Sequence, residues 1–67
     1  MDDAAISAAV TRFLRSVSFS AQRELEKAVR QALAAGTARE GETVTTAVTL
    51  TNDKLRLNIT LYNKLEL

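Results

Sequence analysis

The chain has 67 residues, a formal net charge of +1, and neither Cys nor His. A chain of this length forms one small domain at most, and it buries only about 60% of the surface that its unfolded form exposes. Disulfides are excluded, and so are zinc sites built on thiolate or imidazole ligands. Because a core this small needs a supplement, the composition favours oligomerisation.

Hydrophobic residues make up 46% of the chain, but eleven of them are Ala, so a core must rest mainly on nine Leu and five Val. No stretch approaches the roughly 18 consecutive apolar residues of a membrane span. The start of the chain, with Asp2 and Asp3, is acidic where a secretory signal carries positive charge. These features predict a cytoplasmic protein with no membrane partner.

The first half of the chain has the apolar period of a helix. The spacing i, i+4, i+7, i+8, i+11 predicts a first helix over about residues 3–17, with Asp2 and Asp3 at its positive end and one stripe formed by Ile6, Val10, Phe13, Leu14 and Val17.

The segment Ser18-Phe19-Ser20 is predicted to interrupt the helix, because the hydroxyl of Ser20 can cap a new one. A second helix is expected over about residues 21–35 and is closed by Gly36, with its own stripe of Leu25, Ala28, Val29, Ala32 and Leu33. Its polar face offers two charge pairs at helical spacing, Glu26 with Arg30 and Glu24 with Lys27.

After a loop over residues 36–42, which holds both glycines, the apolar period changes to two. Strands are predicted over about residues 43–51 and 54–67. One face of the first carries Val44, Thr46, Val48 and Leu50, and the second alternates through Leu55, Leu57, Ile59 and Leu61. Both apolar sets share a face only if the loop is even, so a two-residue loop is expected at Asn52-Asp53 or Asp53-Lys54. In either register, Leu65 and Leu67 would overhang the end of the first strand.

The predicted fold is therefore an α+β domain spanning residues 1–67, with two N-terminal helices packed on one face of a C-terminal antiparallel β-hairpin. A two-stranded ribbon is marginal in water and has two edges with unpaired backbone groups. We therefore expect a homo-oligomer, most simply a dimer. The sequence leaves open whether two copies join strand edges or helix faces.

The chain also resembles a known family. The resemblance lies in the segment Ser20 to Arg30, which reads SAQRELEKAVR, in Phe13-Leu14, and in the short runs Thr49-Leu50-Thr51, Leu55-Arg56-Leu57 and Leu65-Glu66-Leu67. These residues are similar to a family of small bacterial proteins classed as a domain of unknown function. The resemblance implies a compact bacterial cytosolic protein and carries no activity onto any residue.

The sequence argues against an enzyme, and it yields no catalytic, cofactor-binding or metal-binding residues. Without His or Cys, acid–base work would fall to carboxylates, Lys54 or Tyr62. Helix capping accounts for Asp2 and Asp3, and a solvated face accounts for Glu24 and Glu26. Glu40 and Glu42 are too sparse for the six or more oxygen ligands of calcium, and no phosphate-binding glycine loop is present. No cofactor is expected.

The function therefore stays unknown at this level, and elimination favours a non-catalytic, self-associating protein that binds another macromolecule. The alternative is a nucleic-acid-binding protein, in which the two helices form a helix-turn-helix, the hairpin forms a wing, and a basic face comprises Arg12, Arg15, Arg23, Lys27 and Arg30. Four acids in the same half of the chain weaken this alternative. The outward row of Thr43, Thr45, Thr49, Thr51 and Thr60 is interpreted as ordinary strand surface, with Tyr62 beside it as a weak interface marker.

Overall fold

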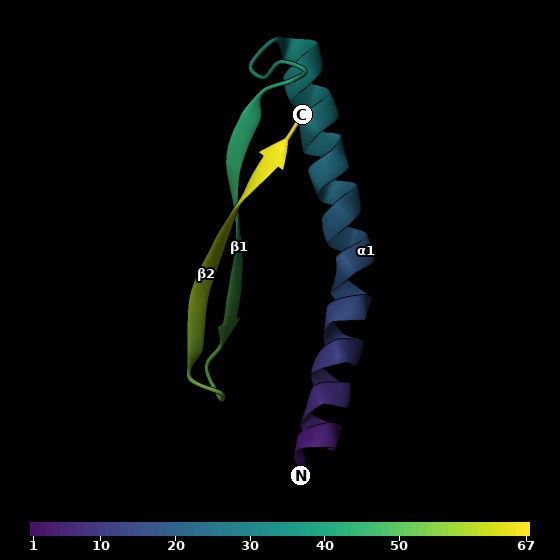
Figure 1. Ribbon diagram of the computed structural model, residues 1–67, viewed down its shortest axis with the longest axis vertical. Coiled ribbons are helices and arrows are strands. Elements are labelled where there is room, and N and C mark those ends of the chain that lie inside the picture. Colours follow the sequence, from purple (N-terminus) through teal and green to yellow (C-terminus); the bar gives the residue numbers. More distant parts are fainter. The chain divides into compact units, whose positions relative to one another are not determined.

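The computed structural model describes residues 1–67 as one helix followed by a hairpin (Figure 1). The elements are α1 (Asp3–Ala35), β1 (Thr43–Asn52) and β2 (Leu57–Glu66). The predicted α+β class is confirmed. The chain divides into two compact units, Met1–Thr37 and Ala38–Leu67.

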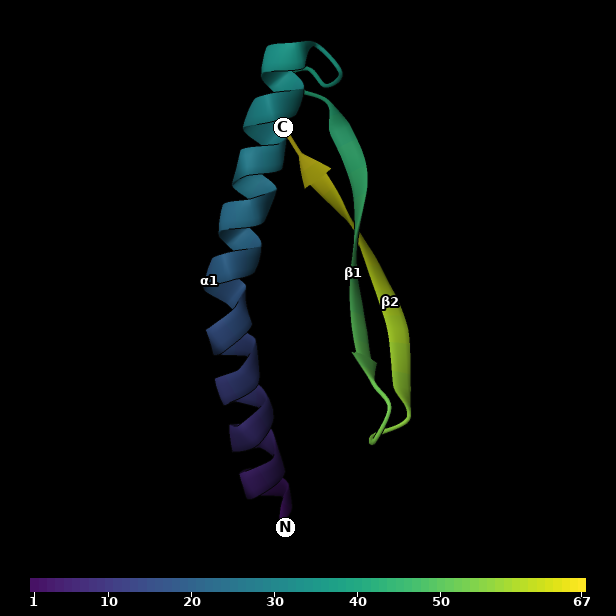
Figure 2. The same ribbon diagram turned by 180° about the vertical axis from the view of Figure 1, so that it is seen from behind.

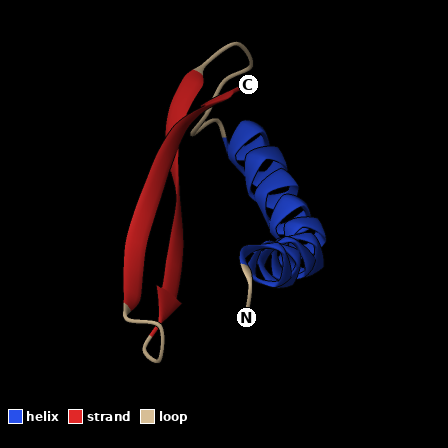
Figure 3. Cartoon of the chain, turned by 60° about the horizontal axis from the view of Figure 1, so that its bottom comes forward, coloured by secondary structure: helices blue, strands red, loops and turns tan.

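The prediction of two helices is wrong, because α1 is a single helix of 33 residues (Figure 3). It passes through Ser18, Phe19 and Ser20 without a break, so Ser20 lies inside the helix and caps nothing. The nearby hydroxyl of Ser16 donates to the carbonyl oxygen of Phe13 at 2.7 Å, as serines within helices often do.

The continuity of α1 has a local physical reason. No Gly or Pro stands between residues 3 and 35, and Ser in a helix interior costs only about 0.5 kcal/mol relative to Ala. A break would instead leave several backbone N–H and C=O groups without helical partners on each side. The two predicted stripes are also in phase, since Val17, Ala21 and Leu25 follow one another at i, i+4 and i+8.

Both ends of α1 are capped as the sequence predicts. At the start, the backbone N–H of Ala5 donates to the Asp2 carboxylate at 2.8 Å. At the end, Gly36 takes the left-handed conformation with φ 78°, its N–H bonds to Leu33, and the N–H of Thr37 bonds to the carbonyl oxygen of Ala32. This pair of bonds is the Schellman closure that glycine permits.

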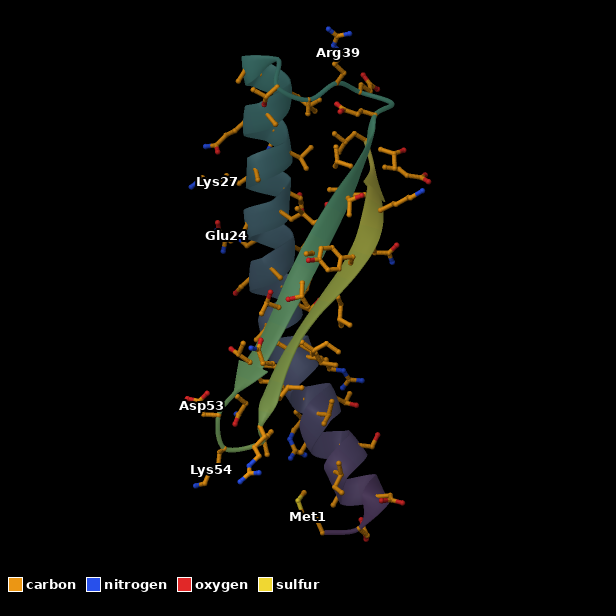
Figure 4. All side chains as sticks on the ribbon, turned by 90° about the vertical axis from the view of Figure 1, so that its left-hand side faces the viewer. Met1, Glu24, Lys27, Arg39, Asp53 and Lys54 are labelled. Carbon is orange, nitrogen blue, oxygen red and sulfur yellow. The ribbon has the colours of Figure 1, made fainter.

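One of the two predicted charge pairs on the helix is formed. Arg30 lies 3.5 Å from the carboxylate of Glu26, and both side chains are largely exposed. Glu24 and Lys27 project outward from the same side of α1 without forming an ion pair (Figure 4). A pair three residues apart in an exposed position contributes little, so competition with water is enough to leave it open.

The hairpin has the even parity that the sequence predicts, but its register differs from the expected ones. Val44 pairs with Leu65, Val48 with Leu61, and Leu50 with Ile59. The apolar residues of both strands therefore share one face, and the two-stranded sheet has the order β1-β2. The second strand begins at Leu57 and not at residue 54, because residues 53–56 form the turn.

The turn has four residues where two were predicted. The Asn52 side chain accepts a hydrogen bond from the N–H of Leu55 at 3.0 Å, and the N–H of Arg56 donates to the carbonyl oxygen of Asp53 at 3.1 Å. Arg56 then takes a positive φ of 52°, so the loop consists of a turn followed by one left-handed residue. Asp53 and Lys54 lie at the tip of this loop (Figure 4).

The predicted overhang of the second strand is also wrong. Lengthening the turn moves every partner along the ladder, so that Leu65 lies opposite Val44 and Glu66 opposite Thr43. The N–H of Leu67 continues the ladder by donating to the carbonyl oxygen of Glu42 at 2.8 Å. The strands therefore match in length, and Figure 2 shows them winding about each other as a twisted ribbon.

The continuity of the helix leads to a testable prediction about Ser20, the predicted cap, and Asp2, the observed cap. We expect Ser20→Ala to raise the free energy of unfolding by about 0.5 kcal/mol, since Ala is the better interior residue. We expect Asp2→Ala to lower it by about 1 kcal/mol, because the true cap is lost. Urea unfolding followed by far-ultraviolet circular dichroism measures both. If Ser20→Ala lowered the free energy of unfolding as much as Asp2→Ala does, Ser20 would be acting as a helix cap and the two-helix prediction would be supported.

Candidate interaction surfaces

The helix carries one continuous apolar stripe. Its residues follow a repeated spacing of four, four and three, which is an 11-residue repeat: Ile6, Val10, Leu14, Val17, Ala21, Leu25, Ala28 and Ala32. At 3.6 residues per turn these positions fall within about a third of the circumference, flanked by Phe13, Val29 and Leu33. An 11-residue repeat keeps a stripe almost parallel to the helix axis, so it suits a straight or slightly right-handed helical partner.

The stripe is open to solvent along α1. Ile6 is 46% exposed, Val10 51% and Leu14 47%, and no residue of the helix is buried. Large side chains occupy the N-terminal part of the stripe, whereas Ala dominates its C-terminal part. The stripe therefore offers several apolar side chains that a single helix cannot cover by itself.

The hairpin carries a second apolar face. The register places Val44, Val48 and Leu50 of β1 beside Leu57, Ile59, Leu61 and Leu65 of β2 on one side of the ribbon. Ile59 is 43% exposed and Leu61 51%, and the chain as a whole contains no buried side chain. A face like this gains stability only when another layer covers it.

The hairpin has two open edges, and the register determines which residues line them. The bond from Leu67 to Glu42 makes that pair a hydrogen-bonded one, and such pairs alternate along an antiparallel ladder. The even-numbered residues of β1 thus bond to β2. The N–H and C=O groups of the odd-numbered residues point outward from the sheet; these are Thr43, Thr45, Ala47, Thr49 and Thr51 on β1. On β2 the outward groups belong to Asn58, Thr60, Tyr62, Lys64 and Glu66.

The cations of α1 lie on the side opposite the stripe. Arg12, Arg15, Arg23, Lys27 and Arg30 all fall within about a third of the circumference at 3.6 residues per turn. Phe19 lies among them, 69% exposed, with the guanidinium of Arg23 5.8 Å from its ring centroid. This cation–π contact is worth about 0.5–1 kcal/mol at an exposed site. Because the helix is continuous, these residues form one basic face on a single helix. The predicted helix-turn-helix is not formed.

Three of the eight acidic residues serve local structure. Asp2 caps α1, Glu26 pairs with Arg30, and the Glu42 carboxylate accepts a hydrogen bond from the N–H of Arg39 at 2.9 Å in the loop before β1. No group of three or more carboxylates lies together as a metal site would require. No helix combines the length and the apolar character needed to cross a membrane.

The Thr row lies where the sequence predicts, on the face of the hairpin opposite its apolar residues. The hydroxyls of Thr49 and Thr60 lie 3.2 Å apart across the two strands. Tyr62 shares this face and is 71% exposed, but it pairs with Ala47 near the middle of the ribbon and does not lie at an overhang.

These features define a class of small α+β protein that combines a long amphipathic helix with a β-hairpin. The chain belongs to the Family of unknown function (DUF6494), whose profile matches residues 1–67, and this confirms the resemblance to a family without an assigned function. No curated protein and no solved structure matches the chain.

The stripe of α1 makes a prediction that a matched pair of substitutions tests. Leu25 lies on the stripe and is 40% exposed, whereas Phe19 lies off it. If the stripe is covered in solution, Leu25→Lys lowers the free energy of unfolding by about 1–3 kcal/mol, because a charge enters an apolar contact. Phe19→Lys then costs less than about 1 kcal/mol. Equal, small losses in urea unfolding at one protein concentration would mean that the stripe stays open.

Proposed function

We propose that this chain is a non-catalytic, self-associating interaction protein whose smallest functional form is a homodimer. The observation that carries the proposal is a sheet of only two strands, which leaves a row of unpaired backbone groups on each side. A helix cannot pair with these groups, because its own backbone bonds are already made within it. Within a sheet, only another strand can supply partners in place of water, and the chain has no third strand.

The lengths of the elements support the same proposal. A helix of 33 residues extends about 50 Å at 1.5 Å per residue, whereas strands of ten residues extend about 34 Å. Even a ribbon lying fully along the helix would leave roughly a third of the helix length, including an end of the stripe, uncovered. If a helix packs on the apolar face of the ribbon, as predicted, part of the helix is still uncovered, and a second chain could cover it.

The absence of His and Cys adds to the case for a non-catalytic role. With no His or Cys in the chain, an active site would have to use carboxylates, Lys or Tyr. Asp2, Glu26 and Glu42 are engaged in capping, pairing and loop closure, and no side chain is buried. We further propose that the protein works in the bacterial cytoplasm, as the sequence predicts.

The proposed self-association predicts that stability depends on protein concentration. If folding and dimer formation are coupled, the melting temperature rises as the concentration rises, because mass action favours the folded dimer. Light scattering coupled to size-exclusion chromatography should give twice the 7.3 kDa mass of one chain at tens of micromolar. A monomer with a melting temperature independent of concentration would contradict the proposal.

A second candidate function is binding to nucleic acid along the basic face of α1. The observation that favours it is the alignment of five cations on one side of a single helix, which the continuity of α1 creates. The predicted helix-turn-helix is absent, so recognition of base edges by a second helix is not part of this candidate. Contacts to phosphates would account for all of the binding.

This second candidate predicts weak binding to duplex DNA that falls steeply with salt. With up to five phosphate contacts, the logarithm of the affinity should fall with a slope of about 4 against the logarithm of salt concentration. The double variant Arg12→Gln, Arg23→Gln should reduce that slope by about 2. Replacing Lys64 on β2 with Gln serves as the control. Fluorescence anisotropy measures the slope, and absence of binding at low salt removes the candidate.

A further inference from the structure

We propose that two copies join through the outer edges of their β1 strands, antiparallel and centred on Ala47, to form a four-stranded sheet of order β2-β1-β1-β2. This inference rests on the proposed self-association and specifies where it occurs. The partner is a second copy of this chain, and the contact is made by backbone groups that the hairpin leaves unpaired.

The composition of the two edges separates β1 from β2. The ten residues of β1, TVTTAVTLTN, contain no charge, no Pro and no Gly. Its ladder with β2 is continuous from Thr43 to Asn52, so no bulge bends the edge away. Long, uncharged, unbulged edges favour pairing with another strand. The edge of β2 instead presents Lys64 and Glu66, and a charged edge opposes such pairing.

The register follows from which backbone groups face outward. On β1 they belong to Thr43, Thr45, Ala47, Thr49 and Thr51, a set that is symmetric about Ala47. A two-fold axis at Ala47 places Thr43 opposite the second copy's Thr51 and Thr45 opposite its Thr49. Every outward N–H and C=O in the set then acquires a partner. A shift of two residues in either direction leaves part of the set unpaired.

The same register continues the apolar face from one copy to the other. Residues directly opposite each other in an antiparallel pair lie on the same side of the sheet. Val44 of one copy then faces Leu50 of the other. Because Leu50 pairs with Ile59 and Val44 with Leu65 within each hairpin, an apolar row crosses all four strands. A shift by one residue would instead place the Thr row of one copy beside the apolar face of the other.

The side chain on the two-fold axis is compatible with close approach. Ala47 is the smallest residue on its face of β1, and its partner Tyr62 lies on β2, away from the new contact. Since β1 carries no charge, no like charges oppose each other across the axis. The wider sheet would present one apolar face of twice the width, suited to cover by the stripes of two helices.

The first experiment compares two proline variants. Thr49 and Thr60 are cross-strand partners whose N–H groups both point away from the hairpin, so Pro at either position removes no β1–β2 bond. Both variants lose the same hydroxyl contact between these residues. Thr49→Pro should raise the dimer dissociation constant about tenfold or more, whereas Thr60→Pro should leave it within about threefold. Sedimentation equilibrium measures both constants on the full chain.

The second experiment tests the axis with charges. Ala47→Lys places two lysines directly opposite each other in the proposed register, and Ala47→Glu does the same with two carboxylates, so each variant alone should dimerise about fivefold or more weakly. Mixing the two should restore association as a heterodimer. The matched variants Thr60→Lys and Thr60→Glu lie on the other edge and should each dimerise like the native chain. These substitutions keep the inference testable where Pro prevents folding.

The outcomes separate this inference from the proposed function. A native chain that stays monomeric contradicts the proposed self-association itself. A native dimer that Thr49→Pro and the charges at position 47 leave intact retains the self-association and overturns the β1 edge as its site, so that the contact lies on another surface. A dimer that weakens equally with changes at positions 49 and 60 also overturns the inference, because association would then involve no particular edge.

Discussion

A sheet with only two strands leaves half of its backbone donors and acceptors without strand partners, and the rest of this molecule has to be understood from that constraint. The hairpin satisfies the inner groups through a continuous ladder from Thr43–Glu66 to Asn52–Leu57. Apart from the N–H of Lys64, which donates to the Asn63 side chain at 2.8 Å, the outer groups of both strands are left to water or to another strand. The long helix adds apolar surface that the single chain leaves uncovered, since its stripe runs along most of its length and none of its side chains is buried. In the proposed dimer, a second copy would supply the strand partners that one copy lacks at its edges.

The parity of the hairpin could be predicted from the sequence, but its register could not. Alternation of apolar and polar residues requires that Val48 and Leu61 share a face, and any even loop meets that requirement. The choice between two and four loop residues depends on local hydrogen bonds. The Asn52 side chain caps the turn, and Arg56 accepts a left-handed conformation that few residues other than Gly, Asn and Asp adopt readily. Periodicity carries no information about either bond, so the predicted overhang at Leu65 and Leu67 was an artefact of the shorter loop.

For the helix, too, some features could be predicted from the sequence pattern and others depended on local chemistry. The stripe, the Asp2 cap and the Gly36 closure were all readable from the sequence. The predicted break at Ser18 to Ser20 assumed that hydroxyl residues end a helix, but they disfavour its interior only slightly. Ser is only a middling interior residue, whereas Gly or Pro would have been needed to stop a helix against the cooperativity of its bonds. Ala21 held the missing signal, because it joins Val17 to Leu25 at helical spacing. Because there is a single helix, the predicted helix-turn-helix is not formed. The same continuity aligns the five cations on one uninterrupted face.

The two apolar surfaces and the open edges limit how a second copy can be accommodated. Pairing helix stripes alone would cover apolar side chains but would leave the same backbone groups unpaired on both strands. Pairing β1 edges satisfies those groups on one side and doubles the width of the apolar face, which increases the surface that the helices must cover. In the proposed dimer the two contacts would be complementary, because edge pairing would give a wider sheet whose apolar face another layer could cover. In the proposed dimer, the charged edge of β2 would limit further growth, since Lys64 and Glu66 oppose the addition of more strands.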